Sequence, residues 1–71
     1  MKIKVTFPAN IKPESVKIII ERNMKQNSEY ECSVEYCGFE DGENVFFISA
    51  NKIEAFYLIG ITASQIIDKF A

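Results

Sequence analysis

The chain has 71 residues, with eight Lys and Arg, ten Asp and Glu, no His and two Cys. This length leaves room for one domain spanning residues 1–71, and a hydrophobic content of 48% excludes a disordered chain. The lack of His removes the usual general base, and two thiols alone do not complete a zinc site. We therefore expect no cofactor, no metal ion and no catalytic site.

Charge is sorted along the chain. Met1–Asn27 carry six Lys and Arg against two Glu, whereas Ser28–Asn44 carry six acids and no base. Val45–Ala71 carry two residues of each sign. The net charge of −2 therefore hides a dipolar layout, which constrains the strands that lie side by side and the surface that a partner would meet.

The first predicted element is a strand over Lys2–Phe7. Ile3, Val5 and Phe7 alternate with polar residues, and this period of two is typical of a half-buried strand. Pro8 ends the strand, because proline cannot donate a hydrogen bond to a sheet.

The next segment, Pro13–Gln26, is compatible with two structures. As a strand it would place Val16, Ile18 and Ile20 on one face, and its three consecutive isoleucines favour this form. As a helix it would carry an apolar stripe made of Val16, Ile19, Ile20 and Met24. Pro13 would then lie in the first turn, where its missing N–H costs little. We prefer the helix, which accounts for more residues but leaves Ile18 on the polar side.

A β-hairpin is predicted to follow. Glu29–Cys37 alternates as a strand, and one face of it carries Tyr30, Cys32, Val34 and Tyr36. Asp41 and Gly42 both tolerate the positive φ of a tight two-residue turn. The return strand Val45–Ala50 is apolar on both faces, which predicts a central position in the sheet.

The last predicted element is a helix over Lys52–Phe70. Asn51 is expected to cap its first N–H groups, with Glu54 reaching back from three residues later. The apolar residues cover an arc of roughly 200° at ~100° per residue. They are Ile53, Ala55, Phe56, Tyr57, Ile59, Ala63, Ile66, Ile67 and Phe70. Gly60 falls inside this arc, where it would let another element approach closely.

These elements predict an α+β fold, a two-layer sandwich in the order strand–helix–strand–strand–helix. The return strand Val45–Ala50 should occupy the centre of a three-stranded antiparallel sheet, with the two helices on one face. The other face would then remain open to solvent or to a partner.

The predicted contact surface lies on this open face. Its expected members are Phe46 and Ile48 in the centre, Lys2 and Lys4 on one rim, and Glu31 and Glu35 on the other. If the hairpin register slips by one residue, Phe47 takes the central place. A two-fold related copy would set the lysine rim against the glutamate rim. The alternative is that Lys and Glu stems simply cover the apolar row.

The element order resembles the opening of the HPr phosphocarrier fold. The likeness is carried by Lys12-Pro13 at the start of the first helix, and by Ile53 and Leu58–Ile61 in the second. It implies a related topology without phosphotransfer, because the phosphorylated His of that family has no counterpart in this chain.

A second resemblance covers Ser33–Phe70, which is similar to the hairpin-plus-helix end of a double-stranded RNA-binding domain. Such domains place a basic cluster at the start of the last helix. Here Lys52 stands beside Glu54, so the resemblance implies the fold of that segment without its RNA contacts.

The function expected from these observations is a small non-enzymatic module for protein contact or assembly, whose partner is another protein or, in a homodimer, a second copy of this chain. The basic residues of the first third are spread out and the pI is about 5.0, so we expect no nucleic-acid partner. The uncharged apolar run Ala55–Ala63 is short of the ~20 residues that span a bilayer, so we expect a cytoplasmic protein. No small-molecule site is evident. The alternative is an acidic decoy for a nucleic-acid-binding protein, which rests on the six acids of Glu29–Glu43. Among them, Glu40, Asp41 and Glu43 are expected to form an uncompensated acidic tip.

Overall fold

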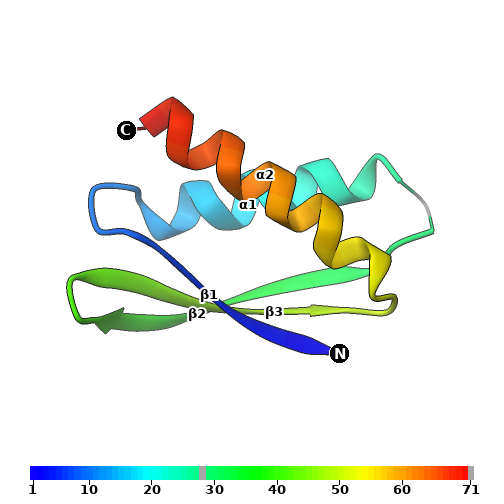
Figure 1. Cartoon of the computed structure of the whole chain (residues 1–71), viewed down its shortest axis with the longest axis horizontal. Helices are drawn as coiled ribbons and strands as arrows, with labels where there is room; N and C mark the ends of the chain where they lie inside the picture. Colours follow the sequence, from blue (N-terminus) through cyan, green and yellow to red (C-terminus); the bar gives the residue numbers. More distant parts are fainter. Residues whose placement is uncertain (28, 71) are drawn as a thin grey trace.

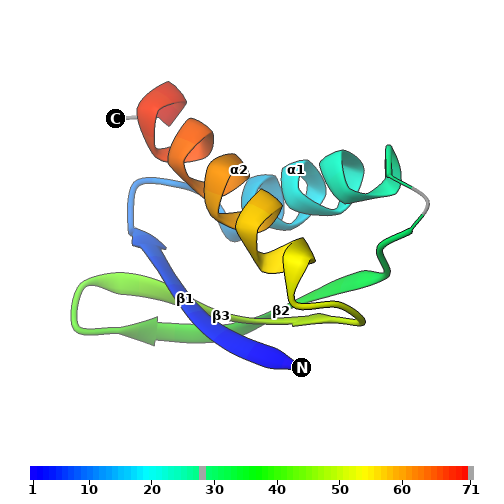
Figure 2. The same ribbon diagram turned by 45° about the vertical axis from the view of Figure 1, so that its right-hand side comes forward.

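The fold is a three-stranded sheet covered on one face by two helices, seen in a computed structural model that describes residues 1–27 and 29–70 (Figure 1). The elements in chain order are β1 (Lys2–Pro8), α1 (Pro13–Lys25), β2 (Cys32–Glu40), β3 (Glu43–Ala50) and α2 (Glu54–Phe70). The sheet is antiparallel in the order β1-β3-β2, so the predicted fold class and the central return strand are confirmed. Figure 2 shows the helices as one layer above the sheet, which leaves the other face open.

Helix α1 forms where the sequence allowed either a helix or a strand. Pro13 is its first residue, and the preceding Lys12 makes no side-chain capping hydrogen bond. Val16, Ile20 and Met24 are buried at helical spacing, whereas Ile18 is 53% exposed, as the helix predicted. The strand alternative is wrong, because burial of this face at a period of 3.6 outweighs the β-propensity of the isoleucines.

The hairpin turn is confirmed, but the strand before it lies three residues later than the predicted Glu29–Cys37 and has the same length, nine residues. Asp41 and Gly42 have φ values of +52° and +81°, and Glu40 pairs with Glu43 across the turn. Strand β2 therefore runs through Cys37 to Glu40 instead of ending at Cys37. It passes this point by means of a β-bulge between Tyr36 and Gly38.

The bulge decides which face each residue of β3 occupies. The pairing shifts by one residue there, so that Tyr36 lies opposite Phe46 and Val34 opposite Ile48. Phe46 and Ile48 are consequently turned toward the helices, and both have no exposed surface. Their predicted place on the open face is wrong, and Phe47 occupies that face instead. The physical reason is that one extra residue in a strand flips the side chains beyond it to the opposite face.

Asn51 does not cap α2, which begins at Glu54. Its side-chain oxygen accepts a hydrogen bond from the Glu31 amide at 2.9 Å, and its side-chain nitrogen donates to the Glu29 carbonyl at 3.1 Å. The predicted capping arrangement is therefore wrong. Asn51 instead ties the end of β3 to the segment that leads into β2, where it satisfies backbone groups beyond the end of the paired strands.

The core lies between the sheet and the two helices. Its largest fully buried side chains are Phe7, Phe46, Ile11, Ile20, Ile48, Ile59, Ile66 and Val16. The Phe7 and Phe46 rings pack edge to face with centroids 5.6 Å apart, a favourable aromatic geometry. Between the helices, Asn23 donates to the Thr62 hydroxyl at 3.4 Å. None of the described helices has the length and apolar character needed to cross a membrane.

Candidate contact surfaces

At the centre of the open sheet face, an aromatic side chain lies between a basic and an acidic one. Phe47 of β3 lies between Lys4 of β1 and Glu35 of β2, which are its two cross-strand partners. Lys2 lies next along β1 and is exposed, and Glu31 is exposed just before β2 begins. The four predicted rim residues are thus all exposed, although the apolar centre is Phe47 rather than Phe46 and Ile48.

Much of the apolar surface on this face is already covered. The Lys2 ammonium lies 5.3 Å from the centroid of the Phe47 ring, within cation–π range, and Phe47 is only partly exposed. Val45 shares the face with Phe47 but is buried, with Thr6 and Gly38 as its cross-strand partners. The open sheet face therefore offers a partner little bare apolar area.

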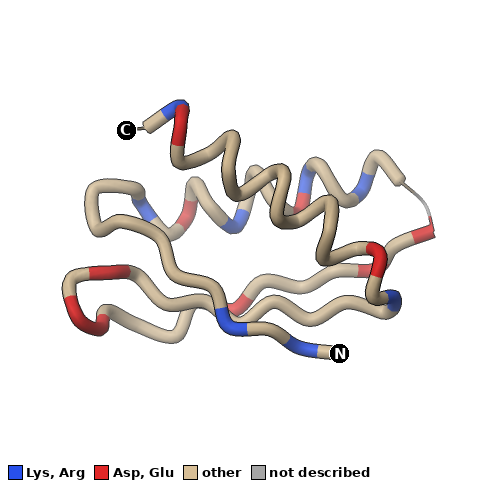
Figure 3. The backbone as a smooth tube through the Cα atoms, viewed as in Figure 1, with Lys and Arg blue, Asp and Glu red and all other residues tan. Residues whose placement is uncertain are grey.

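Charge on this face is also partly compensated within the chain. The Lys4 ammonium lies 4.0 Å from the Glu40 carboxylate, on the strand at the far side of β3. Glu40 was expected to belong to an uncompensated acidic tip, and this ion pair corrects that expectation for Glu40. Asp41 and Glu43 are exposed at the turn itself, where Figure 3 shows the acidic residues gathered. The exposed ion pair between Lys4 and Glu40 contributes at most about 1 kcal/mol to the stability of the fold.

A second surface, with several exposed apolar side chains, lies on α2 on the side turned away from the core. Tyr57 is 74% exposed and Ile53, just before the helix, is 66% exposed. Further exposed residues on this side are Gly60, Ile61 and Ile67. We call these five residues the α2 outer face. The opposite side of the same helix buries Ala55, Ile59 and Ile66 in the core.

The sequence carried a signal for this surface that the prediction did not use. An apolar arc of roughly 200° is about twice the width that a helix needs to pack on one layer. The excess had to remain outside the core, and it contains Ile53 and Tyr57. The contact surface was instead predicted on the sheet, because β3 is apolar on both faces.

Gly60 lies in the middle of the α2 outer face. No atom from the rest of the described chain lies within 4 Å of the position that a Cβ would take there. The close approach that Gly60 was expected to permit is therefore not made by another element of this chain. Glycine inside a helix costs about 0.5–1 kcal/mol relative to alanine, and nothing in the described fold offsets this cost.

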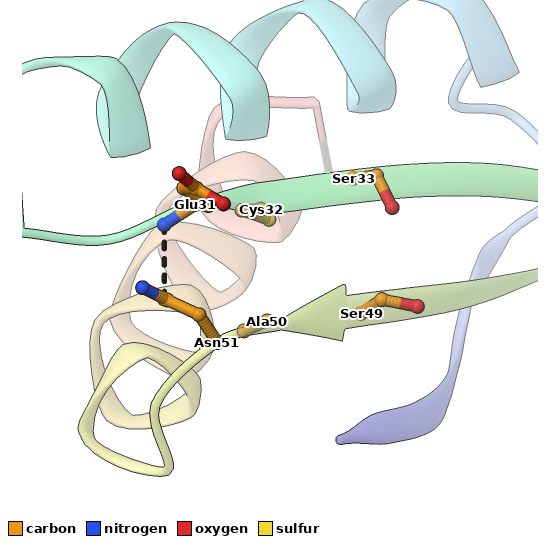
Figure 4. A pocket seen from close by; sticks show the side chains of 6 residues that line it. All are labelled: Glu31, Cys32, Ser33, Ser49, Ala50 and Asn51. Carbon is orange, nitrogen blue, oxygen red and sulfur yellow. Dashed lines mark hydrogen bonds between the residues drawn. The ribbon is translucent and has the colours of Figure 1, made fainter.

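A recess of about 280 Å³ lies at the end of the sheet where β2 and β3 meet (Figure 4). Its lining consists of Glu31, Cys32, Ser33, Ser49, Ala50 and Asn51. Burial raises the pKa of the Cys32 thiol, and the nearby Glu21 carboxylate raises it further. Cys32 is thus held as a neutral thiol at neutral pH, which is the weakly nucleophilic form. The Asn51 side chain is already engaged by the backbone of Glu29 and Glu31.

Metal-ligating residues are scattered in the described ranges. Across residues 1–27 and 29–70, no three Cys, Asp or Glu side chains come close enough to hold a metal ion. The exposed large apolar side chains of the described ranges are most numerous on the α2 outer face, which holds Ile53, Tyr57, Ile61 and Ile67. Comparisons with protein families, curated proteins and solved structures found no match for this chain.

Proposed function

We propose that this protein is a small non-enzymatic module for protein contact or assembly, and that it works through the α2 outer face. The observation that carries the proposal is the exposure of Tyr57 and Ile61 on one side of α2 and of Ile53 just before the helix, at a spacing of four residues. Single exposed apolar residues are ordinary on protein surfaces, but a continuous apolar stripe is typical of a docking surface.

The energetic argument rests on what a partner would gain. Covering a large apolar side chain yields roughly 1.5–3 kcal/mol. Tyr57 also suits an interface in particular, since its ring supplies apolar area and its hydroxyl can bond at the rim. The open sheet face has less to offer, because Lys2 already covers the Phe47 ring.

The stripe is suited to packing against another helix, because apolar residues at positions i, i+4 and i+8 lie on one side of a helix. The fold presents α2 as the outer surface of the helix layer, so a partner reaches it without opening the core. Ala55, Ile59 and Ile66 on the inner side already hold α2 in place.

A photo-crosslinking amino acid at position 57, introduced in the cells that make the protein, tests this function. We expect irradiation to give a discrete adduct with a protein, identified by mass spectrometry. The matched control places the same amino acid at Ile18, which is 53% exposed on the other helix and lies outside the α2 outer face. Equal adducts at positions 18 and 57, or none at 57, would overturn the proposal.

A further inference from the structure

We propose that the partner of the α2 outer face is a second copy of this chain, bound with the two α2 helices antiparallel and crossing at Gly60. This inference rests on the proposed function, since it names the occupant of the same surface. Three features of α2 and the two residues before it carry it: the placement of the charges, the equal spacing of Ile53 and Ile67 from Gly60, and the glycine itself.

The charges of α2 lie only at its two ends. No charged residue occurs between Glu54 and Asp68, as Figure 3 shows along the helix. Glu54 is the first residue of α2 and Lys52 lies two residues before it, whereas Asp68 and Lys69 lie in the last turn. A parallel pair of helices would set each of these charges beside its own copy, which is repulsive. An antiparallel pair sets beginning against end, where opposite signs can meet and the helix dipoles oppose each other.

The positions of the residues select Gly60 as the crossing point. Lys52 and Asp68 are each eight residues from Gly60, and Ile53 and Ile67 are each seven. A two-fold axis at Gly60 therefore brings Lys52 of one copy to the level of Asp68 of the other, and Ile53 to the level of Ile67. Each contact then occurs twice, because a two-fold interface uses the same patch on both copies.

Gly60 has a role in this arrangement that it lacks within one chain. It lies in regular helix, and no other described element comes within 4 Å of the position that a Cβ would take, so neither backbone conformation nor internal packing calls for glycine. Helices ordinarily pack with axes about 8–10 Å apart, and a glycine at the crossing point allows the two backbones to come closer. Tyr57 and Ile61 would then lie on either side of the crossing and close over it.

The expected dimer is weak. One pair of short helices buries an area at the low end of specific interfaces, below about 1,200 Å². We therefore expect association that depends on concentration, with monomer at low micromolar concentration and dimer at high concentration. The mass measured by sedimentation should rise from 8.1 kDa toward twice that value.

Variants at Gly60 test the crossing point. Gly60→Leu adds apolar surface but blocks close approach, so we expect dimerisation to weaken at least about tenfold. Gly60→Ala is the matched control and should dimerise nearly as the parent chain does. Circular dichroism should show both variants folded, because the space around Gly60 is open. A hydrophobic association without this geometry would instead strengthen in Gly60→Leu, which would overturn the proposal.

Charge reversal tests the antiparallel direction. Lys52→Asp and Asp68→Lys should each weaken the dimer by about tenfold, since each creates two like-charge contacts. The double variant should restore the affinity of the parent chain, which a parallel pair would not do. Phe47→Ser on the open sheet face should leave the dimer unchanged. Loss of the dimer in Phe47→Ser, or no rescue in the double variant, would overturn the proposed interface.

The outcomes separate this inference from the function on which it rests. A chain that stays monomeric at millimolar concentration overturns the second copy as partner. If the crosslink from position 57 then joins a different protein, the contact function stands with another occupant. A crosslinked product of twice the chain mass supports both proposals.

Discussion

Asn44 joins three separate parts of the fold through its side-chain amide. It is buried in β3, its side-chain nitrogen donates to the Ile11 carbonyl at 3.0 Å, and its side-chain oxygen accepts from the Tyr36 hydroxyl at 3.1 Å. One amide thus joins the β1–α1 connection, β3 and β2. Buried polar groups of this kind are stabilising only while every partner is satisfied.

Replacing Asn44 should therefore cost more than a typical surface change. We expect Asn44→Ala to lower the free energy of unfolding by roughly 1–3 kcal/mol, because the buried Ile11 carbonyl loses its donor. Tyr36→Phe is the control, since it removes one of the two bonds and should cost only about 0.5–1.5 kcal/mol. Urea denaturation measures both. If Asn44→Ala were no less stable than Tyr36→Phe, the role assigned to the Ile11 contact would be wrong.

Strand β2 shows how one glycine sets the faces of a whole hairpin. Gly38 has a φ of +112°, a backbone conformation that residues with a Cβ rarely adopt. The bulge at this point shifts the pairing of β2 with β3 by one residue. A regular hairpin around Asp41 and Gly42 would have turned Phe46 and Ile48 outward. Instead the bulge buries them and pairs Glu35, on the open face, with Phe47.

Gly38→Ala tests this account of the strand. The space around Gly38 is open, so the substitution acts through backbone strain and should cost roughly 1–3 kcal/mol. Gly60→Ala, also in open space but in regular helix, should instead stabilise the monomer by about 0.5–1 kcal/mol. Thermal unfolding of both variants at low concentration gives the comparison. A neutral Gly38→Ala would show that the bulge tolerates an ordinary residue and does not depend on glycine.

At the scale of the whole molecule, some large apolar residues of this short chain are buried in the core and others are exposed on the surface. A domain of this length is stable by only about 4–10 kcal/mol, so each core residue carries a large share. Ile59 is 1% exposed, whereas Tyr57, two residues away on the same helix, is largely exposed. The two positions separate the folding role of α2 from its proposed contact role.

Ile59→Ala should cost about 2–5 kcal/mol and bring the chain close to unfolding. Tyr57→Ala should change the stability of the monomer by no more than about 0.5 kcal/mol while removing contact through the α2 outer face. Chemical denaturation at low micromolar concentration measures the first effect and sedimentation measures the second. A large loss of monomer stability in Tyr57→Ala would place that residue in the core and remove the basis of the proposed surface.

The sequence alone determined the order of the elements, the hairpin turn, the central strand and the single covered face. These follow from periodicity, from Pro13 at a helix start and from Asp41-Gly42 at a turn, all of which act over a few residues. The acidic decoy was likewise predicted from sequence, and it stays a prediction.

Only the tertiary structure decided which apolar residues are left outside. A bulge of one residue places Phe47 on the open face of the sheet and turns Phe46 and Ile48 into the core, because strand faces alternate with a period of two. Asn51 bonded to the backbone before β2 instead of to the helix that follows it, because those strand-end groups lie nearby only in the folded chain. The exposed stripe on α2 exists because a core this small covers only one side of a helix that is apolar over twice that width.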